Sequence, residues 1–383
     1  MIIDRLHLVN FRNYKDVVVS FREGTNIFLG KNGQGKTNLL EAVHFLSVGS
    51  SPRSSHQGDL ARWGEHEFRL LAHGREGGLE YTFDAFFNGA RLQYRLNGKE
   101  IALSRVPGHL PTVFFSPDDL FLLKGPPAAR RDYLDRLFFQ ASPQYRFYLQ
   151  RYNRVVAQRN NLLKQGLAGH LPSEELAPWD EELVSLGSRI IRERLLSLKK
   201  LAVHVGRVHN ALSGYVEKVE LLYRSSVPLP SAVPTLEEMT EAFTKALQAN
   251  WPQERARGLT LSGPHRDDLT LLLDGKDLRS FGSQGQQRTA ILALKFAEAE
   301  FLKDELQKRP LLLLDDVFSE LDEIRQGQLR HLFSEVGQVF ITSTDATPLP
   351  EELRTGAAVF HIEAGQIRPS GSSPGDAGLL EEL

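Results

Sequence analysis

A glycine-rich run near the N-terminus most constrains what this chain can fold into. The pattern G-x-x-x-x-G-K-[ST] is met by Gly30-Lys31-Asn32-Gly33-Gln34-Gly35-Lys36-Thr37. The apolar run 25–29 precedes it, and the run 39–46, with helical periodicity, follows it. A phosphate-binding loop needs a strand before it and a helix after it, so this context favours a real loop over a chance glycine-rich turn.

The residue types of this loop explain how it would hold phosphate. Its backbone N–H groups are expected to point inward and to surround the anion, together with the positive end of the following helix. We expect Lys36 to reach the outer phosphates and the Thr37 hydroxyl to hold Mg²⁺. The predicted nucleotide-binding residues of this segment are Gly30, Lys31, Asn32, Gly33, Gln34, Gly35, Lys36, Thr37 and Asn38.

Composition places the chain among ordinary globular proteins. It has 383 residues, 41% hydrophobic and 25% charged, which leaves room for two or three domains. No apolar run approaches the roughly 18 residues of a membrane span, and we expect no signal peptide at the N-terminus. The absence of cysteine excludes disulfides and thiol catalysis and fits a reducing cytoplasm. The net charge of −2 argues neither for nor against nucleic acid.

Strand patterns lie at both ends of the chain and helical patterns lie between them. The predicted strands are 2–9, 17–21, 26–29, 67–72, 79–87, 91–96, 99–103, 111–115, 219–223, 269–273, 311–316 and 338–342. The predicted helices are 128–139, 142–165, 180–212, 236–249, 284–306 and 322–335. One sheet must therefore collect strands from both ends, which predicts an α/β domain split by an inserted, mainly helical lobe. The predicted boundaries are 1–125, 126–250 for the lobe, 251–368, and a disordered tail 369–383.

A second motif is expected to contribute carboxylates to the same site as the phosphate-binding loop. The apolar run 311–314 ends in Asp315 and Asp316, as expected for a buried strand that carries carboxylates to the phosphate site. We expect Asp315 to bind the Mg²⁺ shell and Asp316 to polarise the attacking water as a general base. With Lys36, both are predicted catalytic residues. A core strand that merely ends in a solvated turn is the alternative.

A third motif opens the predicted helix 284–306. The run Ser283-Gln284-Gly285-Gln286 combines a hydroxyl, a glycine and helix N-terminal N–H groups, which together make an anion site. It resembles the S-G-G-Q signature of ABC ATPases, in which the signature of one subunit caps the nucleotide of the other. This resemblance implies nucleotide binding by Ser283, Gly285 and Gln286 and a catalytic role for Ser283. An ordinary helix N-cap is the alternative. The run 319–322 resembles the D-loop of the same superfamily.

Residues 1 to about 367 resemble the RecF family of bacterial recombination mediators. The matching runs are 10–14, 30–42, 116–120, 125–127 with Arg130 and Arg131, 263–269, 283–286 and 315–322. The run Gly263-Pro264-His265-Arg266-Asp267-Asp268-Leu269 discriminates most, because generic ABC ATPases lack it. The stretch between Thr37 and Ser283 is longer than the insert of transporter subunits and far shorter than the arms of SMC proteins. Those two classes, a transporter subunit and an SMC-like clamp, are the alternatives.

The resemblance implies a P-loop ABC-type ATPase head with a helical lobe, using ATP and Mg²⁺. It further implies an ATP-dependent homodimer that clamps duplex DNA or single-strand/duplex junctions. With RecR and RecO, such a protein assists RecA loading at gaps during DNA replication, repair and the SOS response. It implies a cytoplasmic, nucleoid-associated protein without a membrane partner, and a slow ATPase stimulated by DNA.

Three departures from the usual ABC pattern support slow turnover. Asp316 stands where most ABC ATPases carry glutamate, so the side chain is one methylene shorter. No histidine follows the strand 338–342, where Thr344 is a candidate substitute for the γ-phosphate sensor. No glutamine marks the usual Q-loop place near 115–118. These differences favour a clamp or switch over a fast motor.

Residues 140–164 contain no Asp or Glu, and aromatic side chains lie among their cations. This pattern suits sequence-independent binding to DNA phosphates, although a solvated helix face is an equally good explanation. The candidate DNA contacts are Arg146, Arg151, Arg154, Arg159 and Lys164. We expect an interface or nucleotide-contact role for His265 and Arg266, with a metal site there as a weaker alternative. Arg12 and Arg53 are candidate nucleotide contacts.

Overall fold

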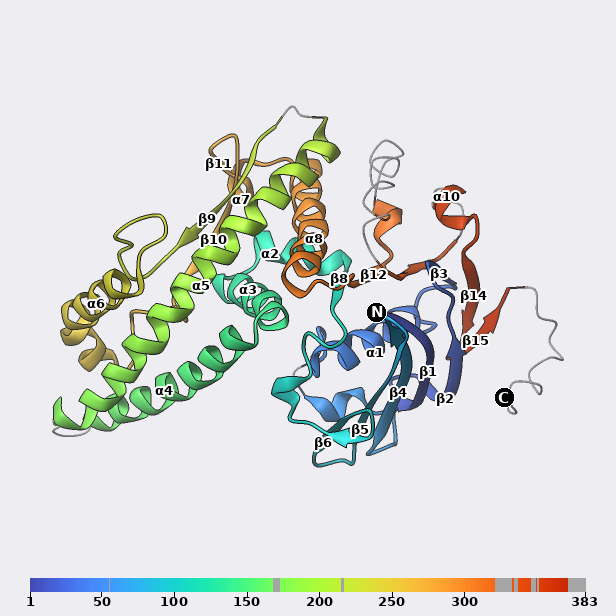
Figure 1. The fold of residues 1–383 in the computed structure, drawn as a ribbon, viewed down its shortest axis with the longest axis horizontal. Coiled ribbons are helices and arrows are strands. Elements are labelled where there is room, and N and C mark those ends of the chain that lie inside the picture. Colours follow the sequence, from blue (N-terminus) through green and yellow to red (C-terminus); the bar gives the residue numbers. More distant parts are fainter. Residues whose placement is uncertain are drawn as a thin grey trace. The chain divides into compact units, whose positions relative to one another are not determined.

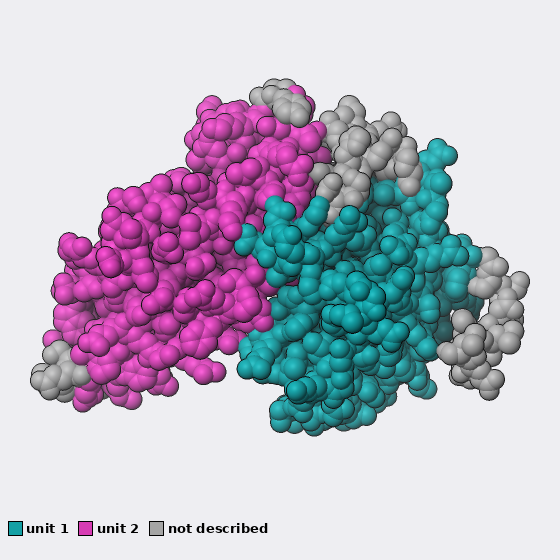
Figure 2. Space-filling model, in the orientation of Figure 1, with its two compact units in different colours: residues 1–119, 302–383 teal, residues 120–301 magenta. Residues whose placement is uncertain are grey.

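The computed structural model describes residues 1–54, 56–167, 173–214, 217–320, 333, 337–345, 349 and 351–370. Its contacts divide the chain into two compact units, residues 1–119 with 302–383 and residues 120–301 (Figure 2). The second unit runs past the predicted lobe boundary at 250, because strand β10 (Asp268–Leu273) pairs with β9 (Val219–Arg224). The predicted assignment of functions to residues 1–125, 126–250, 251–368 and 369–383 stays a prediction.

An antiparallel sheet forms one layer of the first unit (Figure 1). Its strand order is β2-β1-β4-β5-β6-β7. On β4 buried and exposed residues alternate, as expected for a sheet with one face in the core. The strands are β1 (Ile2–Phe11), β2 (Tyr14–Ser20), β4 (Phe68–Glu76), β5 (Leu79–Phe87), β6 (Leu92–Leu96) and β7 (Lys99–Glu100).

The second sheet of this unit is parallel except at one edge. Its order is β15-β14-β3-β13-β12-β8, and only β15 runs antiparallel to its neighbour. All residues of β8, β12 and β13 are buried, which explains their continuous apolar sequences. The strands are β3 (Thr25–Leu29), β8 (Thr112–Phe115), β12 (Leu311–Asp315), β13 (Val339–Ser343), β14 (Ala358–Glu363) and β15 (Gln366–Pro369).

Helix α1 (Lys36–Val48) contacts both sheets, so it is buried almost all round. Its apolar residues join one core with aromatic side chains from both sheets. Because the strand β3 ends at Leu29 and α1 begins at Lys36, the glycine-rich run lies at the carboxyl edge of the parallel sheet. The short helices are η1 (Gln57–Leu60), η2 (Leu103–Arg105), η3 (Pro117–Leu120), η4 (Val317–Glu320) and α10 (Glu351–Arg354).

The second unit is mainly helical (Figure 1). The long helices α4 and α5 pack side by side, and both contact α6. A small antiparallel sheet, ordered β11-β10-β9, includes β11 (Lys276–Asp277) and packs against α3 and α5. The helices are α2 (Phe121–Lys124), α3 (Pro127–Ala141), α4 (Pro143–Leu167), α5 (Ser173–Ser213), α6 (Leu236–Arg257), α7 (Leu278–Phe281) and α8 (Gln284–Leu306), which continues past residue 301.

The predicted α/β head with a helical insertion is confirmed, and the errors concern element ends and one hairpin that was not predicted. Helix α6 runs eight residues beyond its predicted end at residue 249, because Pro252 does not stop it and Gly258 (φ 65°) caps it. The hairpin β14–β15 was not predicted, and Pro369, the predicted start of the tail, ends β15. The predicted helix 322–335, apart from residue 333, and residues 371–383 lie outside the described residues. Among the described residues no helix is long and apolar enough to cross a membrane.

Candidate nucleotide-binding site

The backbone of the loop 30–37 takes conformations that its glycines permit. Gly33 (φ 79°) and Gly35 (φ 117°) both have positive φ, which turns successive N–H groups toward one side of the loop. A Cβ at Gly35 would lie 2.6 Å from the Asn13 side chain, and a Cβ at Gly30 would lie 2.4 Å from the Ile362 carbonyl oxygen. The loop therefore depends on glycine for both its dihedral angles and its close packing.

Lys36 lies folded back over the loop, with 7% of its surface exposed. Its Nζ donates hydrogen bonds to the carbonyl oxygens of Gly30 (2.5 Å) and Lys31 (3.0 Å). Burial lowers the pKa of the Lys36 ammonium, and the carboxylates of Asp316 and Asp315 oppose that shift. The ammonium thus stands at the mouth of a loop lined by backbone donors, where a phosphate would be a stronger partner than two carbonyls.

Thr37 and Asp315 meet at the carboxyl edge of the parallel sheet. The Thr37 hydroxyl donates to the Asp315 carboxylate, at 2.9 Å to Oδ1 and 2.8 Å to Oδ2. Burial raises the pKa of the Asp315 carboxyl, while hydrogen bonds from the hydroxyls of Thr342 and Thr37 act in the opposite direction. A hydroxyl and a carboxylate in contact are the oxygen ligands that suit Mg²⁺, so the residues present fit the predicted metal ligands.

Thr342 holds the two acidic residues together, a contact that sequence reasoning missed. Its hydroxyl donates to Asp315 Oδ1 (2.7 Å) and accepts from the backbone N–H of Asp316 (3.0 Å). Asp316 has φ 51°, so the strand ends at Asp315 and the next side chain leaves the strand direction. Thr342 is buried in β13, whereas Thr344, the candidate sensor, is exposed.

Asn13 and Tyr14 support the loop from the turn after β1. Asn13 Nδ2 donates to the Gln34 carbonyl (2.8 Å), and the buried Tyr14 hydroxyl donates to the Gly35 carbonyl (2.9 Å). Gln34 Oε1 in turn accepts from the N–H of Ala364, in the β14–β15 turn (2.6 Å). The N-terminal run that resembles the RecF family therefore fixes the shape of the phosphate-binding loop.

The two arginines suggested as nucleotide contacts have protein partners. Arg12 donates from Nε (3.0 Å) and Nη2 (2.6 Å) to the buried carboxylate of Glu41. Arg53 donates to Asn38 Oδ1 (3.0 Å) and lies 3.5 Å from Glu41. Arg12 uses two of its nitrogens to bind Glu41. Arg53 has 47% of its side chain exposed, so its remaining N–H groups can still donate to a ligand.

In the second unit, Ser283 and Gln286 form a capping box at the start of α8. The Ser283 hydroxyl accepts from the Gln286 N–H (3.2 Å), and Gln286 Oε1 accepts from the Ser283 N–H (2.7 Å). Gln286 Nε2 donates to Glu217 (2.6 Å), which sequence reasoning missed. Ser283 is exposed, and nearby Phe281 exposes 75% of its surface. The N-cap alternative is therefore correct, and it leaves the signature prediction open, because a capped helix N-terminus can still meet an anion.

Known proteins match this chain over nearly its whole length. The model of an AAA domain matches residues 5–105. The "DNA replication and repair protein RecF" of Heliobacterium modesticaldum is 43% identical, covering 97% of this chain and all of that protein. The chain belongs to the RecF family.

Solved structures agree with this assignment. A structure of the recombination mediator protein RecF with ATP in the RecFOR pathway superposes with a TM-score of 0.89 at 33% identity, covering 96% of this chain and 97% of that one. An SMC head bound to a winged-helix domain of ScpA shares the fold, with a TM-score of 0.53 at 17% identity, covering 98% of this chain and 99% of that one. The membership excludes a transporter subunit.

The run 263–269 that discriminates the RecF family lies largely inside the second unit, although Arg266 is exposed and donates from Nε to the Thr260 carbonyl (3.0 Å). His265 Nδ1 lies 2.7 Å from the Tyr152 hydroxyl and its Nε2 lies 3.2 Å from the Thr260 carbonyl oxygen. Asp267 accepts from the N–H (2.7 Å) and hydroxyl (2.8 Å) of Ser226 and from the Tyr223 hydroxyl, while Asp268 accepts from Arg130. Burial lowers the pKa of His265 to about 4. The described residues include no group of three His, Asp or Glu that could hold a metal, so the weaker metal alternative gains no support there.

Two of the five candidate DNA contacts are buried. Arg159 is 0% exposed and pairs with Asp180 (2.6 Å) and Glu254 (2.7 Å). Arg146 is 8% exposed, with its guanidinium 5.2 Å from the centre of the Phe139 ring. Including Arg146 and Arg159 was wrong, since a guanidinium enclosed by protein cannot reach a DNA phosphate. Arg151, Arg154 and Lys164 are exposed and remain candidates.

Proposed function

We propose that this RecF-family protein is a slow, DNA-stimulated ATPase of recombinational repair, and that ATP-dependent dimerisation lets it clamp DNA. The observation that carries the proposal is the contact of the Thr37 hydroxyl with both oxygens of Asp315, directly beside the folded-back ammonium of Lys36. It brings two motifs 278 residues apart into one site with the donors and acceptors that a nucleotide and Mg²⁺ require. A relative with ATP in the RecFOR pathway supports the choice of nucleotide.

Each residue of the site has a proposed role. The loop N–H groups between Asn32 and Thr37 bind phosphate oxygens, and Lys36 moves its donors from the Gly30 and Lys31 carbonyls to the outer phosphates. Thr37 and Asp315 hold Mg²⁺, which when bound neutralises charge on the phosphates. Asp316 accepts a proton from the attacking water, with its backbone fixed by Thr342. Its short side chain favours slow turnover.

The helix N-terminus at Ser283 stays exposed although its capping box satisfies the Ser283 hydroxyl, so we assign it to the nucleotide of a second copy. Ser283 and Gly285 would approach the γ-phosphate from the opposite side, while Gln286 keeps the helix capped. ATP then joins two subunits, and hydrolysis releases them. The D-loop prediction, residues 319–322, concerns side chains outside the described part of the structure.

The test is DNA binding with and without ATP, using the intact chain and two variants. Wild type should bind labelled duplex and gapped DNA tightly only with ATP. Lys36→Ala should lose ATP affinity by at least about 100-fold, because a charge-assisted contact to phosphate disappears, and with it the ATP-dependent DNA binding. Lys15→Ala, which removes an exposed lysine on β2, should behave as wild type. Equal weak binding in every arm would refute the clamp and leave only the ATPase assignment.

The exposed cations of α4 are the proposed DNA surface. Arg151, Arg154 and Lys164 would contact backbone phosphates without reading sequence. Changing all three to Glu should reduce affinity and flatten its dependence on salt, since each phosphate contact contributes roughly one unit of slope. An unchanged salt slope would move DNA to another surface. We further propose that the protein acts near the nucleoid with RecR and RecO to load RecA.

A further inference from the structure

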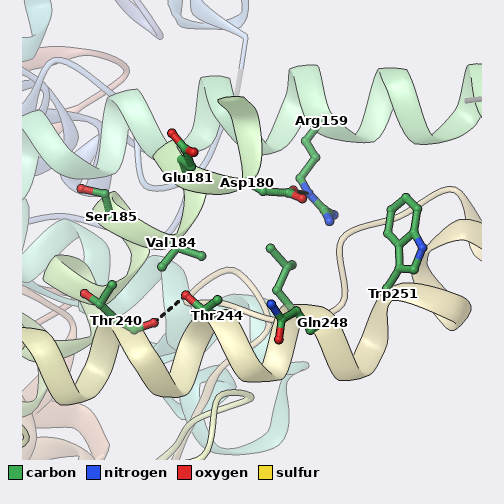
Figure 3. A pocket seen from close by; sticks show the side chains of 10 residues that line it. Arg159, Asp180, Glu181, Val184, Ser185, Thr240, Thr244, Gln248 and Trp251 are labelled. Atoms are coloured by element: carbon green, nitrogen blue, oxygen red, sulfur yellow. Dashed lines mark hydrogen bonds and ion pairs between the residues drawn. The ribbon is translucent and has the colours of Figure 1, made fainter. Parts of the chain in front are cut away.

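A pocket in the second unit has no part in the nucleotide site. It has a volume of about 380 Å³ and opens between α5 and α6 near the far end of α4 (Figure 3). Its lining includes Arg159, Asp180, Glu181, Val184, Leu247 and Trp251. Polar groups from α5 and α6 complete the rim, namely Ser185, Thr240, Thr244 and Gln248.

Among the described residues that line the pocket, Arg159 is the only cation, and protein groups already neutralise it. Arg159 donates from Nε to Asp180 (2.6 Å) and from Nη1 to the Thr260 hydroxyl (2.9 Å), and its Nη2 lies 2.7 Å from Glu254. Glu181 is exposed and forms no ion pair with any described residue. The lining thus carries two carboxylates, Asp180 and Glu181, and one guanidinium that Asp180 and Glu254 already neutralise, so the pocket carries negative charge and would repel a phosphate.

The hydroxyls of α6 add acceptors instead of donors. Thr240 donates its hydroxyl proton to the Leu236 carbonyl (2.7 Å), and Thr244 donates to the Thr240 carbonyl (2.9 Å), a bond drawn in Figure 3. Their oxygen lone pairs remain available to a ligand. Two exposed cations of the neighbouring helices have acidic partners, Arg151 with Glu182 and Lys245 with Glu241.

The apolar walls of the pocket would suit the uncharged part of a cationic ligand. Val184 and Leu247 are each 6% exposed and form an apolar surface. Trp251 stands at the end of the pocket next to Arg159, where an aromatic face could attract a further cation (Figure 3). A ligand that fits must join a positively charged, donor-rich group to an apolar stem.

We propose that this pocket binds an arginine side chain of a partner protein. Its guanidinium donates to Glu181 and to Asp180, and its methylenes lie against Val184 and Leu247. The rim side chains Ser185 and Gln248 each offer a donor and an acceptor, which suits the peptide groups beside that arginine. A free polyamine has no such groups, so a protein segment is the better occupant.

The capped peptide Ac-Ala-Arg-Ala-NH₂ tests the proposal, with the intact protein and Trp251 as fluorescent reporter. The other two tryptophans, Trp63 and Trp179, are changed to Phe so that only the pocket responds. The isosteric citrulline peptide, which lacks the charge, should bind at least about tenfold more weakly. Glu181→Gln should weaken the arginine peptide by a similar factor and leave the citrulline peptide unchanged. Glu80→Gln, an exposed acid on β5, is the matched control and should change neither affinity.

Three results would overturn the proposal. Equal binding of the arginine and citrulline peptides would show that charge does not select the ligand. Tighter binding of spermidine than of the arginine peptide would assign the pocket to a small polyamine. An arginine affinity that Glu181→Gln leaves unchanged, with an unchanged thermal midpoint, would place binding elsewhere. Lys36→Ala serves as a further arm, since loss of the nucleotide site should not affect this pocket.

Discussion

Two runs of this chain, the phosphate-binding loop 30–37 and the family-specific run 263–269, both combine glycine with charged residues and differ in what their charged groups contact. Gly35 in the phosphate-binding loop has φ 117°, and Gly263 in the family-specific run has φ 124°. A Cβ at either glycine would collide with a neighbour, at 2.6 Å from Asn13 and 2.2 Å from Tyr152 respectively. Both runs thus need glycine for the same two physical reasons.

The difference lies in the partners of the charged side chains. Lys36 holds only two carbonyls of its own loop, which a phosphate can replace. The second run meets Arg194, which is 1% exposed and donates to Tyr145 (2.9 Å), Pro264 (2.8 Å) and Asp135 (2.7 Å). Apart from the exposed Arg266, the charged residues of the family-specific run thus belong to a network of internal bonds, whereas the bonds of Lys36 are local and replaceable.

Removing Arg194 should produce the largest change in stability, and it tests whether the network around the run 263–269 stabilises the fold. Arg194→Ala removes the buried guanidinium that donates to the Tyr145 and Tyr223 hydroxyls, the Pro264 carbonyl and the half-buried Asp135, so we expect a loss of about 3–5 kcal/mol in the free energy of unfolding. Urea unfolding followed by the fluorescence of Trp179 and Trp251 reports on this unit. Lys199→Ala, an exposed residue of the same helix, should stay within about 0.5 kcal/mol of wild type. A loss as small as the control would mean that the network is dispensable.

The buried His265 should make stability depend on pH. Burial depresses its pKa from 6.5 to about 4, so the folded state favours the neutral ring. Its stabilising contribution is complete above pH 6.5 and is lost as the pH falls toward 4, by at most about 3 kcal/mol. The measurement is the difference in unfolding free energy between wild type and His265→Gln across pH 4–7. That difference should shrink as the pH falls; if it stays constant, His265 does not prefer its neutral form in the folded protein.

Sequence reasoning succeeded where chemistry is local. The loop 30–37, the strand 311–315 and the helix after Ser283 each follow from consecutive residues, and the structure has all three elements. The order of the elements also predicts the insertion, because strands from both ends of the chain form one sheet and the helical segment lies between them. Periodicity located α3, α4 and α8 to within a few residues.

Sequence reasoning failed where tertiary contacts decide the outcome. A run of cations such as 146–164 does not reveal that Arg159 faces Asp180 and Glu254, because those partners lie on other helices. Likewise, Thr342 and Glu217 have no motif of their own, and only the fold brings them to Asp315 and Gln286. The strand β14 pairs in parallel with β3, more than 300 residues earlier, and its short sequence carries little signal alone.

Ser283 lies between the two cases, since it caps its own helix and is proposed to serve a second subunit. Ser283→Arg removes the cap, which should lower the free energy of unfolding by about 1 kcal/mol. The bulky cation should block ATP-dependent dimerisation while ATP affinity of the monomer stays within roughly twofold. Sedimentation with and without ATP gives the first quantity and nucleotide titration the second. A large drop in monomer affinity would instead place Ser283 at the nucleotide of its own subunit.

Changing Glu217 should produce the smallest effect, and it tests whether the N-terminus of α8 is only capped or also serves the nucleotide of a second subunit. Glu217 accepts from Gln286 Nε2, and this bond turns Gln286 Oε1 toward the Ser283 N–H. Glu217→Ala should therefore lower the free energy of unfolding by about 0.5–1.5 kcal/mol, the range of one hydrogen bond. If Ser283 serves a second subunit, the looser cap should also weaken ATP-dependent dimerisation. Glu217→Gln keeps an acceptor oxygen and should restore most of both losses. A stability loss without any change in dimerisation would make the run at Ser283 purely structural.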